Sequence, residues 1–188
     1  MEDAVFSVEL ESLGYAVLQF RANCRMDVFC VLKNTDDDWR GLDLNKADIL
    51  FTIVVADHRL LKLVSRNITS EVIKNSRPRR LMGLTLSISN TKRKGHLLGL
   101  DLIAYDPVFN PNNVRVLVQN LDPVIHRDIL YSYEDIGMHG EPEQIRRRIS
   151  RYFSEGINWD TQKEVLYPEL EPPPPGYKPV EYKPDREQ

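Results

Sequence analysis

Residues 5–32, VFSVELESLGYAVLQFRANCRMDVFCVL, carry the pattern that decides the fold. Apolar and polar side chains alternate from Phe6 to Glu11. A period of two is typical of a β-strand with one buried face. The stretches 15–24 and 28–32 are rich in β-branched and aromatic residues, which favours two further strands. The sequence therefore predicts a sheet that begins near the N-terminus.

The same signals recur along the chain. Residues 49–55 are almost continuously apolar, as expected of a strand that is covered on both faces. Alternation returns in 84–89, and an apolar stretch follows at 97–104 after the charged, turn-like segment 90–95. This order predicts a hairpin with a longer loop. A further short strand is expected at 114–118.

Two helices are expected, at 68–75 and 142–153. The first would take Ser65 or Asn67 as its cap. The second starts with a proline, which suits the first helical position because its missing N–H costs nothing there. One face of the second helix would carry Ile145, Ile149 and Phe153. Many short strands with few helices predict a mainly β fold, an immunoglobulin-like β-sandwich with one or two short packed helices.

Proline divides the chain into a domain and a tail. Seven of the twelve prolines lie between Pro168 and Pro184. Proline fixes φ and lacks an N–H, so a run of four joins neither a helix nor a central strand. We therefore expect a folded domain over 1–160 and a disordered, extended polyproline tail over 161–188.

Composition narrows the function classes. The longest apolar stretches fall far short of the ~20 residues that span a bilayer, and the acidic, alternating N-terminus is unlike a signal peptide. Cys24 and Cys30 would lie too far apart on one strand to form a disulfide. We therefore expect no membrane insertion, and a nuclear or cytoplasmic location.

Charge is concentrated in the middle of the chain. Residues 62–94 hold nine Lys and Arg against one Glu, between two acidic flanks. Such a segment can bind a polyanion such as nucleic acid, or it can lie against the protein's own acidic segments. Almost no aromatic residues interleave the basic ones, as base stacking would require. The second interpretation is therefore favoured.

Signals for catalysis and metal binding are weak. His126-Arg127-Asp128 matches the start of a kinase catalytic loop, but Tyr133 stands where that loop needs a metal-binding Asn. The four histidines and two cysteines show no ligand spacing. We expect a protein that is not an enzyme, with no catalytic residue, metal or cofactor.

Four short motifs occur in a suggestive order in the second half of the chain: Val114-Arg115-Val116, the run 144-QIRRRI-149, the run 157-INWD-160 and the run 166-LYP-168. In kind, order and spacing they resemble motifs of the anti-silencing-function histone chaperones. The resemblance implies an immunoglobulin-like sandwich in the nucleus that binds core histones through a sandwich face. It also implies that Val114, Arg115 and Val116 bind the partner.

Alternation along a strand gives a more specific expectation for these three residues. If the valines are buried, Arg115 points to the other face, where it can pair with a carboxylate of the partner. The alternative is an exposed arginine on a sheet. Trp159 is expected to be a core or edge plug rather than a contact residue.

The tail supports an alternative function. Tyr167, Pro168 and Leu170 fit YPxL, which resembles peptides bound by sorting-machinery adaptors, and Pro174, Pro175 and Tyr177 fit PPxY, which resembles ligands of WW domains. A preformed polyproline helix loses little entropy when it docks on an aromatic groove. In this interpretation the protein is an adaptor or a viral structural protein whose tail recruits such partners.

Overall fold

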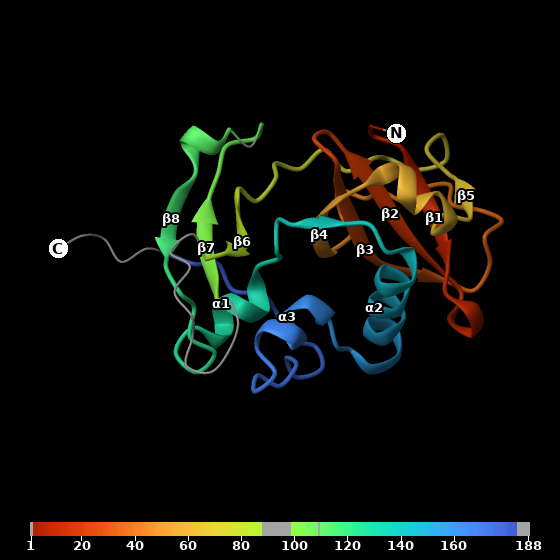
Figure 1. Cartoon of the computed structure of the whole chain (residues 1–188). Coiled ribbons are helices and arrows are strands. Elements are labelled where there is room, and N and C mark those ends of the chain that lie inside the picture. Colours follow the sequence, from red (N-terminus) through yellow and green to blue (C-terminus); the bar gives the residue numbers. More distant parts are fainter. Residues whose placement is uncertain (1, 88–98, 109, 184–188) are drawn as a thin grey trace. The chain divides into compact units, whose positions relative to one another are not determined.

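The computed structural model describes residues 2–87, 99–108 and 110–183 (Figure 1). The chain divides into two compact units, each made of two separate stretches of sequence. Unit 1 comprises Met1–Pro78 and Gly137–Asn158, and unit 2 comprises Arg79–Ile136 and Trp159–Gln188. A six-stranded sheet lies in unit 1 and a three-stranded sheet in unit 2. The prediction of a mostly β fold with few helices is confirmed.

Unit 1 is built around a sheet in the order β5-β1-β2-β3-β4-β9. Its strands are antiparallel except for β9, which pairs parallel to β4. The elements of this unit are β1 (Val5–Glu9), η1 (Glu11–Leu13), β2 (Tyr15–Arg21), β3 (Arg25–Lys33), β4 (Ile49–Val55), η2 (Asp57–Lys62), β5 (Arg66–Asn67), β9 (Met138–His139) and α2 (Pro142–Glu155). The strand predicted at 49–55 is thus confirmed with the same ends, and those predicted at 5–11, 15–24 and 28–32 are confirmed with shifted ends.

Both faces of the unit 1 sheet are covered. On β2, Ala16 and Leu18 belong to one apolar cluster, together with Ile145 and Ile149 of α2. Val17, which points the opposite way, belongs to a second cluster formed with Trp39, Leu44 and Ile68. The strand most completely covered on both faces is therefore β2. β4 was predicted to be the strand covered on both faces, but its side chains Thr52 and Val54 are only half-buried.

Helix α2 agrees closely with its sequence pattern. Its first residue is Pro142, and Gly156 ends it with φ 73°, a left-handed conformation that glycine adopts without strain. Ile145 and Ile149 are buried, and Phe153 packs against the same cluster.

The helix predicted at 68–75 is wrong. Ile68 is buried against the sheet instead, and the Thr69 hydroxyl accepts a hydrogen bond from the Val5 amide, at 2.9 Å. The Asn67 side chain accepts from the Thr69 amide and so closes a turn. Several residues in 68–75 are β-branched and have low helix propensity, so these tertiary contacts decide the conformation.

Unit 2 contains an antiparallel sheet in the order β6-β7-β8. Its elements are β6 (Met82–Leu86), β7 (Leu100–Ala104), η3 (Pro111–Asn113), β8 (Arg115–Val118), α1 (Arg127–Ser132) and α3 (Thr161–Leu166). The predicted hairpin is present as the β6–β7 pair, whereas its turn at 90–95 lies outside the described residues. Residues 134–136 lie beside β6, where Asp135 forms an isolated bridge with Leu84. The approach is so close that a Cβ on Gly83 would lie 2.6 Å from the Ile136 side chain.

The segment after Trp159 differs from the predicted tail. Residues 161–166 form α3, and the Lys163 ammonium donates to the carbonyls of Leu130 and Tyr133 at 2.8 and 2.6 Å, at the C-terminal end of α1. Lys163 is 1% exposed. Its three donors satisfy carbonyls that the end of a helix leaves unpaired. The chain from Trp159 onward is therefore part of unit 2, and the contacts do not divide the molecule at residue 160.

Candidate interaction surfaces

The first candidate surface is strand β8, which contains the V-R-V motif. β8 pairs with β7 on one side, and within the described residues no other strand pairs with it. Arg115 is exposed, Val116 is 39% exposed and Val114 is half-buried. The condition set for Arg115, that the valines on either side be buried, is therefore not met. This part of the strand presents side chains to solvent on both faces.

The ladder of β8 also contains an irregularity. Val116 pairs with Ile103 and Val118 with Leu102, so Leu117 is an extra residue on the β8 side. A bulge of this kind twists an edge strand and limits how far another strand can pair along it. The exposed edge of β8 is thus short, and Arg115 and Val116 occupy its regular part.

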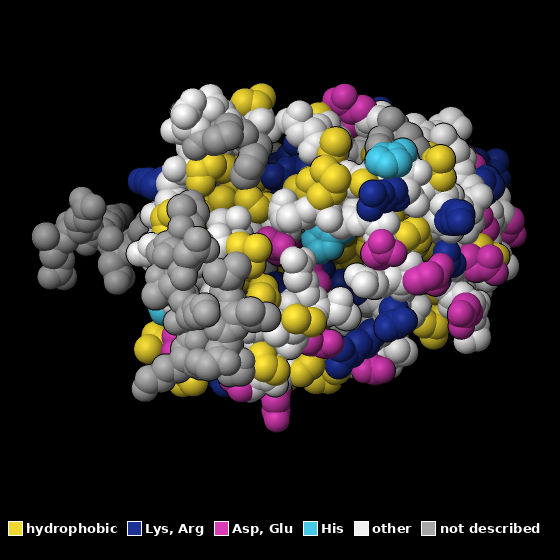
Figure 2. Space-filling view, in the orientation of Figure 1, with side chains coloured by type: hydrophobic (Ala, Val, Ile, Leu, Met, Phe, Trp, Pro, Cys, Tyr) yellow, Lys and Arg dark blue, Asp and Glu magenta, His cyan; other side chains and the backbone are white. Residues whose placement is uncertain are grey.

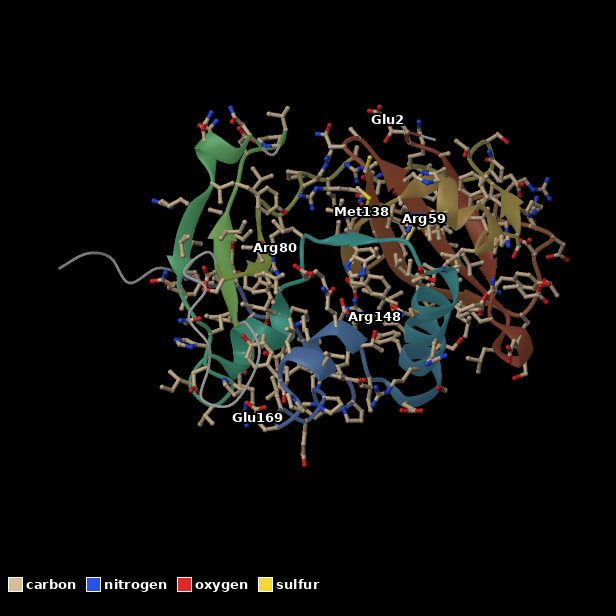
Figure 3. The ribbon with its side chains drawn as sticks, in the orientation of Figure 1. Glu2, Arg59, Arg80, Met138, Arg148 and Glu169 are labelled. Atoms are coloured by element: carbon tan, nitrogen blue, oxygen red, sulfur yellow. The ribbon has the colours of Figure 1, made fainter. Side chains whose placement is uncertain are left out.

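Arg115 has no ion pair or hydrogen-bond partner among the residues that the structure describes. The arginines of the QIRRRI run differ from it and from one another. Arg148, which is labelled in Figure 3, comes from α2. Its Cζ lies 4.0 Å from the centre of the Phe51 ring, and its Nε donates to Asn158 Oδ1 at 2.8 Å. The Asn158 amide in turn donates to the Leu50 carbonyl at 2.7 Å, so two of the motifs act together in packing unit 1.

The remaining motifs lie mostly in the interior of unit 2. Trp159 is 2% exposed, which confirms its predicted role as a core plug. Tyr167 is fully buried, and its hydroxyl accepts from the Leu100 amide at 2.8 Å and donates to the Leu121 carbonyl at 3.2 Å. Leu170 is also buried and Pro168 is exposed. The YPxL tyrosine and leucine are thus part of the core, which explains them without a partner.

The PPxY motif has a defined conformation. The Tyr177 amide donates to the Pro174 carbonyl at 3.0 Å, and Gly176 has φ 74°. A type II turn requires positive φ at its third position, which glycine provides, and commonly has proline at its second. Pro174 and Pro175 are exposed, whereas Tyr177 is half-buried.

Tyr177 is held by residues of α1. Its hydroxyl donates to Asp128 Oδ1 at 3.2 Å and lies 3.5 Å from the Ser132 hydroxyl. Its ring meets the Tyr131 ring edge-on at 5.2 Å, and Tyr131 meets Trp159 edge-on at 5.5 Å. Burial, with a further contribution from the Asp128 carboxylate, raises the pKa of Tyr177 above its ordinary value.

These contacts involve residues that the sequence analysis did not select. Residues 130–135, LYSYED, provide Tyr131, Ser132 and Tyr133. The sequence contained one signal for these contacts. Two tyrosines flank a serine in 131–133, in a chain whose tail is rich in proline and tyrosine. His126-Arg127-Asp128, in contrast, has a structural role at the start of α1, where His126 Nδ1 accepts from the Asp122 amide at 2.9 Å.

Three arginines of the basic segment 62–94 are engaged with the protein itself, whereas Lys62 and Lys74 are exposed. Arg66 pairs with Glu71 and Asp36, and Arg77 donates to the carbonyls of Leu44 and Ala47. Arg80 donates to the Ser132 carbonyl and lies over the Tyr133 ring. On the face that Figure 2 draws, the coloured Lys and Arg side chains are interspersed with Asp and Glu. These contacts favour the self-neutralising interpretation, and residues 88–94 lie outside the described range.

The described residues offer neither a metal site nor a membrane-spanning helix. No group of three or more His, Cys, Asp and Glu is placed to hold a metal ion. None of the described helices combines the length and the apolar character needed to cross a bilayer. Cys24 and Cys30 are both exposed free thiols, and Cys30 Sγ lies 3.4 Å from the Tyr152 hydroxyl.

Comparison with known proteins gives one match. No curated protein and no solved structure matches the chain. A family model described as a domain of unknown function, DUF8309, matches residues 1–171. This span includes β8, α3 and the buried Tyr167, and it stops before the four consecutive prolines. The chain therefore belongs to the DUF8309 family.

Proposed function

We propose that this protein is a non-enzymatic protein-interaction module that binds a core histone through residues 114–116 of the β8 edge. The observation that carries the proposal is the exposure of β8. Of the four motifs that resemble the anti-silencing-function chaperones, the other three are largely engaged in packing, through Arg148, Asn158, Trp159 and Tyr167. Arg115 is exposed and without a partner in the described residues, so it is available to another molecule.

The chemistry of the edge suits a protein partner. An edge strand offers unpaired backbone N–H and C=O groups, which an extended segment of a partner can use. Val116 adds apolar area, and Arg115 adds a charge that pairs with a carboxylate. Because the bulge at Leu117 shortens the regular edge, side-chain contacts supply much of the affinity. The immunoglobulin-like arrangement and the nuclear location that the resemblance implies belong to this proposal.

Binding of the full chain to purified core histones tests the proposal. Arg115→Glu should weaken binding by about tenfold or more if Arg115 meets a desolvated carboxylate. The substitution also makes the chain more negative, which by itself would increase its attraction to a basic histone. A loss of affinity therefore reports a local contact. Arg147→Glu, at an exposed arginine of α2, makes the same charge change elsewhere and should leave binding within about twofold.

Equal effects of the two substitutions would show that only net charge matters, and would refute the β8 site. Binding of no core histone by the full chain at low salt would refute the histone partner. Val116→Asp provides an independent check, because it removes apolar contact area at the neighbouring position without changing Arg115.

One observation favours the alternative function, recruitment of partners by the tail, for the PPxY motif only. Pro174 and Pro175 are exposed, so the two prolines of the PPxY motif lie at the surface. The YPxL half is disfavoured because Tyr167 and Leu170 are buried. Capture by WW domains that depends on Tyr177, together with a silent Arg115→Glu, would favour the adaptor function over the histone-binding one.

A further inference from the structure

Residues 171–182, here called the strap, follow the core of unit 2 and run along α1. Side chains of α1 and of the residue after it hold the strap through hydrogen bonds. Tyr131 donates to the Glu171 carbonyl at 2.7 Å, and Tyr177 donates to Asp128 at 3.2 Å. The Val180 amide donates to the Ser132 hydroxyl at 2.9 Å, and the Tyr182 amide to the Tyr133 hydroxyl at 2.7 Å.

Apolar contacts accompany these bonds. The Tyr177 ring lies edge-on to Tyr131, and Pro173 is buried. Aromatic rings that take up proline and tyrosine side chains are the means by which proline-rich ligands are bound in trans. α1 and the residue after it are therefore the receptor for the chain's own strap, which they contact through the side chains of Asp128, Tyr131, Ser132 and Tyr133.

The bound strap holds the PPxY motif in a conformation unlike that of a WW ligand. A polyproline II segment has negative φ at every residue and no internal hydrogen bond. In the strap, Gly176 has φ 74° and the Tyr177 amide is bonded to the Pro174 carbonyl. The tyrosine side chain is also engaged by Tyr131 and Asp128. A WW groove cannot take up the motif until the strap leaves α1.

We propose that the strap is an intramolecular ligand of α1 that masks the Pro174-Pro175-Gly176-Tyr177 motif, and that its release exposes the motif to WW domains. The proposal is independent of histone binding at β8. Few contacts hold the strap, and most of residues 174–181 are exposed. Docked and released forms therefore exchange, and the affinity of the full chain for a WW domain is reduced in proportion to the released fraction.

The test compares a WW domain that recognises PPxY binding to the full chain and to a synthetic peptide of residues 171–183. The peptide has no α1 on which to dock, so it should bind at least about tenfold more tightly than the full chain. Equal affinities, or a peptide that the WW domain does not bind, would overturn the proposal.

Gly176→Ala makes the test specific, because Gly176 is the variable position of PPxY. An added Cβ meets no atom within 4 Å, yet φ +74° is strained for alanine. The docked turn is therefore weakened while the motif stays intact. Binding of the full chain should tighten by about fivefold, with the peptide unchanged. Gly41→Ala is the matched control, since Gly41 also has positive φ and open space, but lies in unit 1.

A second measurement needs no WW domain. Tyr133→Phe removes the hydroxyl that accepts the Tyr182 amide and keeps the ring that Arg80 covers. Amide hydrogen exchange at Tyr182 should accelerate at least about fivefold, with a smaller increase at Val180. Tyr105→Phe, which removes another hydroxyl of unit 2 that bonds to Arg80, should leave both amides unchanged. Unchanged exchange in Tyr133→Phe, or unchanged WW affinity in Gly176→Ala, would show that the strap is not a releasable ligand.

Discussion

Tyr167 and Tyr177 stand ten residues apart in one proline-rich stretch and belong to different kinds of structure. Tyr167 is fully buried, and its hydroxyl joins the backbone of Leu100 to that of Leu121. Tyr177 is half-buried, and its partners are side chains of α1. A tyrosine bonded to the backbone of other segments maintains the fold, whereas one bonded to side chains at the surface can leave without disturbing it.

The strongest test of this difference replaces each tyrosine by alanine. Tyr167→Ala removes a buried aromatic side chain and should lower the free energy of unfolding by about 3–5 kcal/mol. Tyr177→Ala should lower it by less than about 1 kcal/mol, because the strap lies outside the core. Chemical denaturation of both variants measures the difference. Similar losses would show that the strap is as much a part of the fold as Tyr167.

Lysine residues allow the same comparison with a smaller expected effect. Lys163→Met leaves the carbonyls of Leu130 and Tyr133 without their donor, and should destabilise the protein by about 2–3 kcal/mol. Lys178 is exposed in the strap, so Lys178→Met should change stability by less than about 0.5 kcal/mol. Melting temperatures of the two variants provide the measurement. A neutral Lys163→Met would contradict the assignment of α3 to the core.

Removing only the hydroxyl groups isolates their hydrogen bonds. Tyr167→Phe leaves the Leu100 amide without its acceptor in a buried site, at a cost of about 1–2 kcal/mol. Tyr177→Phe gives up a bond to an exposed carboxylate, which water replaces, and should cost less than about 0.5 kcal/mol. The difference between the two urea midpoints should therefore have the same sign as in the alanine pair, with a smaller size. A larger loss in Tyr177→Phe than in Tyr167→Phe would reverse the comparison.

The smallest effect concerns pH. Burial raises the pKa of Tyr177 in the docked strap, so docking favours the protonated hydroxyl. The contribution to docking is complete below about pH 10, the ordinary pKa of tyrosine, and is lost as the pH rises through the raised value. Tyrosine fluorescence, which does not depend on hydrogen exchange, can follow docking as the pH is raised. Compared between wild type and Tyr177→Phe, it should show release of the strap only at alkaline pH. Release that begins near neutral pH would indicate a different titrating group.

Local patterns predicted what local physics decides. β1 and α2 follow directly from their periodicity, and the proline at the start of α2 and the glycine after it lie where capping rules place them. The helix expected at 68–75 failed because contacts with distant residues, such as the Val5 amide, outweigh a weak propensity. The orientation argued for Arg115 depended on buried valines on either side, and this condition is not met because β8 is an edge strand, a position that alternation alone cannot reveal.

The tail shows where composition misleads. Prolines dominate residues 168–184 and favour an extended chain, yet Tyr167 and Leu170 are buried. The sequence shows that residue 167 is a tyrosine, with an apolar ring and one hydroxyl. It does not show that this hydroxyl accepts a hydrogen bond from the Leu100 amide. The receptor for the strap was missed for the same reason, because Asp128, Tyr131 and Tyr133 acquire their role only from residues that follow some forty to fifty positions later.

Each unit is made of two separate stretches of the chain, and this determines when each unit can form during synthesis. Unit 1 lacks α2 until residue 155 has left the ribosome, and unit 2 lacks Lys163 and Tyr167 until about residue 170. At about 5–20 residues per second, the apolar strands of both sheets wait several seconds for the segments that cover them. Incomplete chains therefore expose apolar surface on which chaperones act. A stop codon anywhere before Tyr167 releases a chain in which unit 2 cannot complete its core.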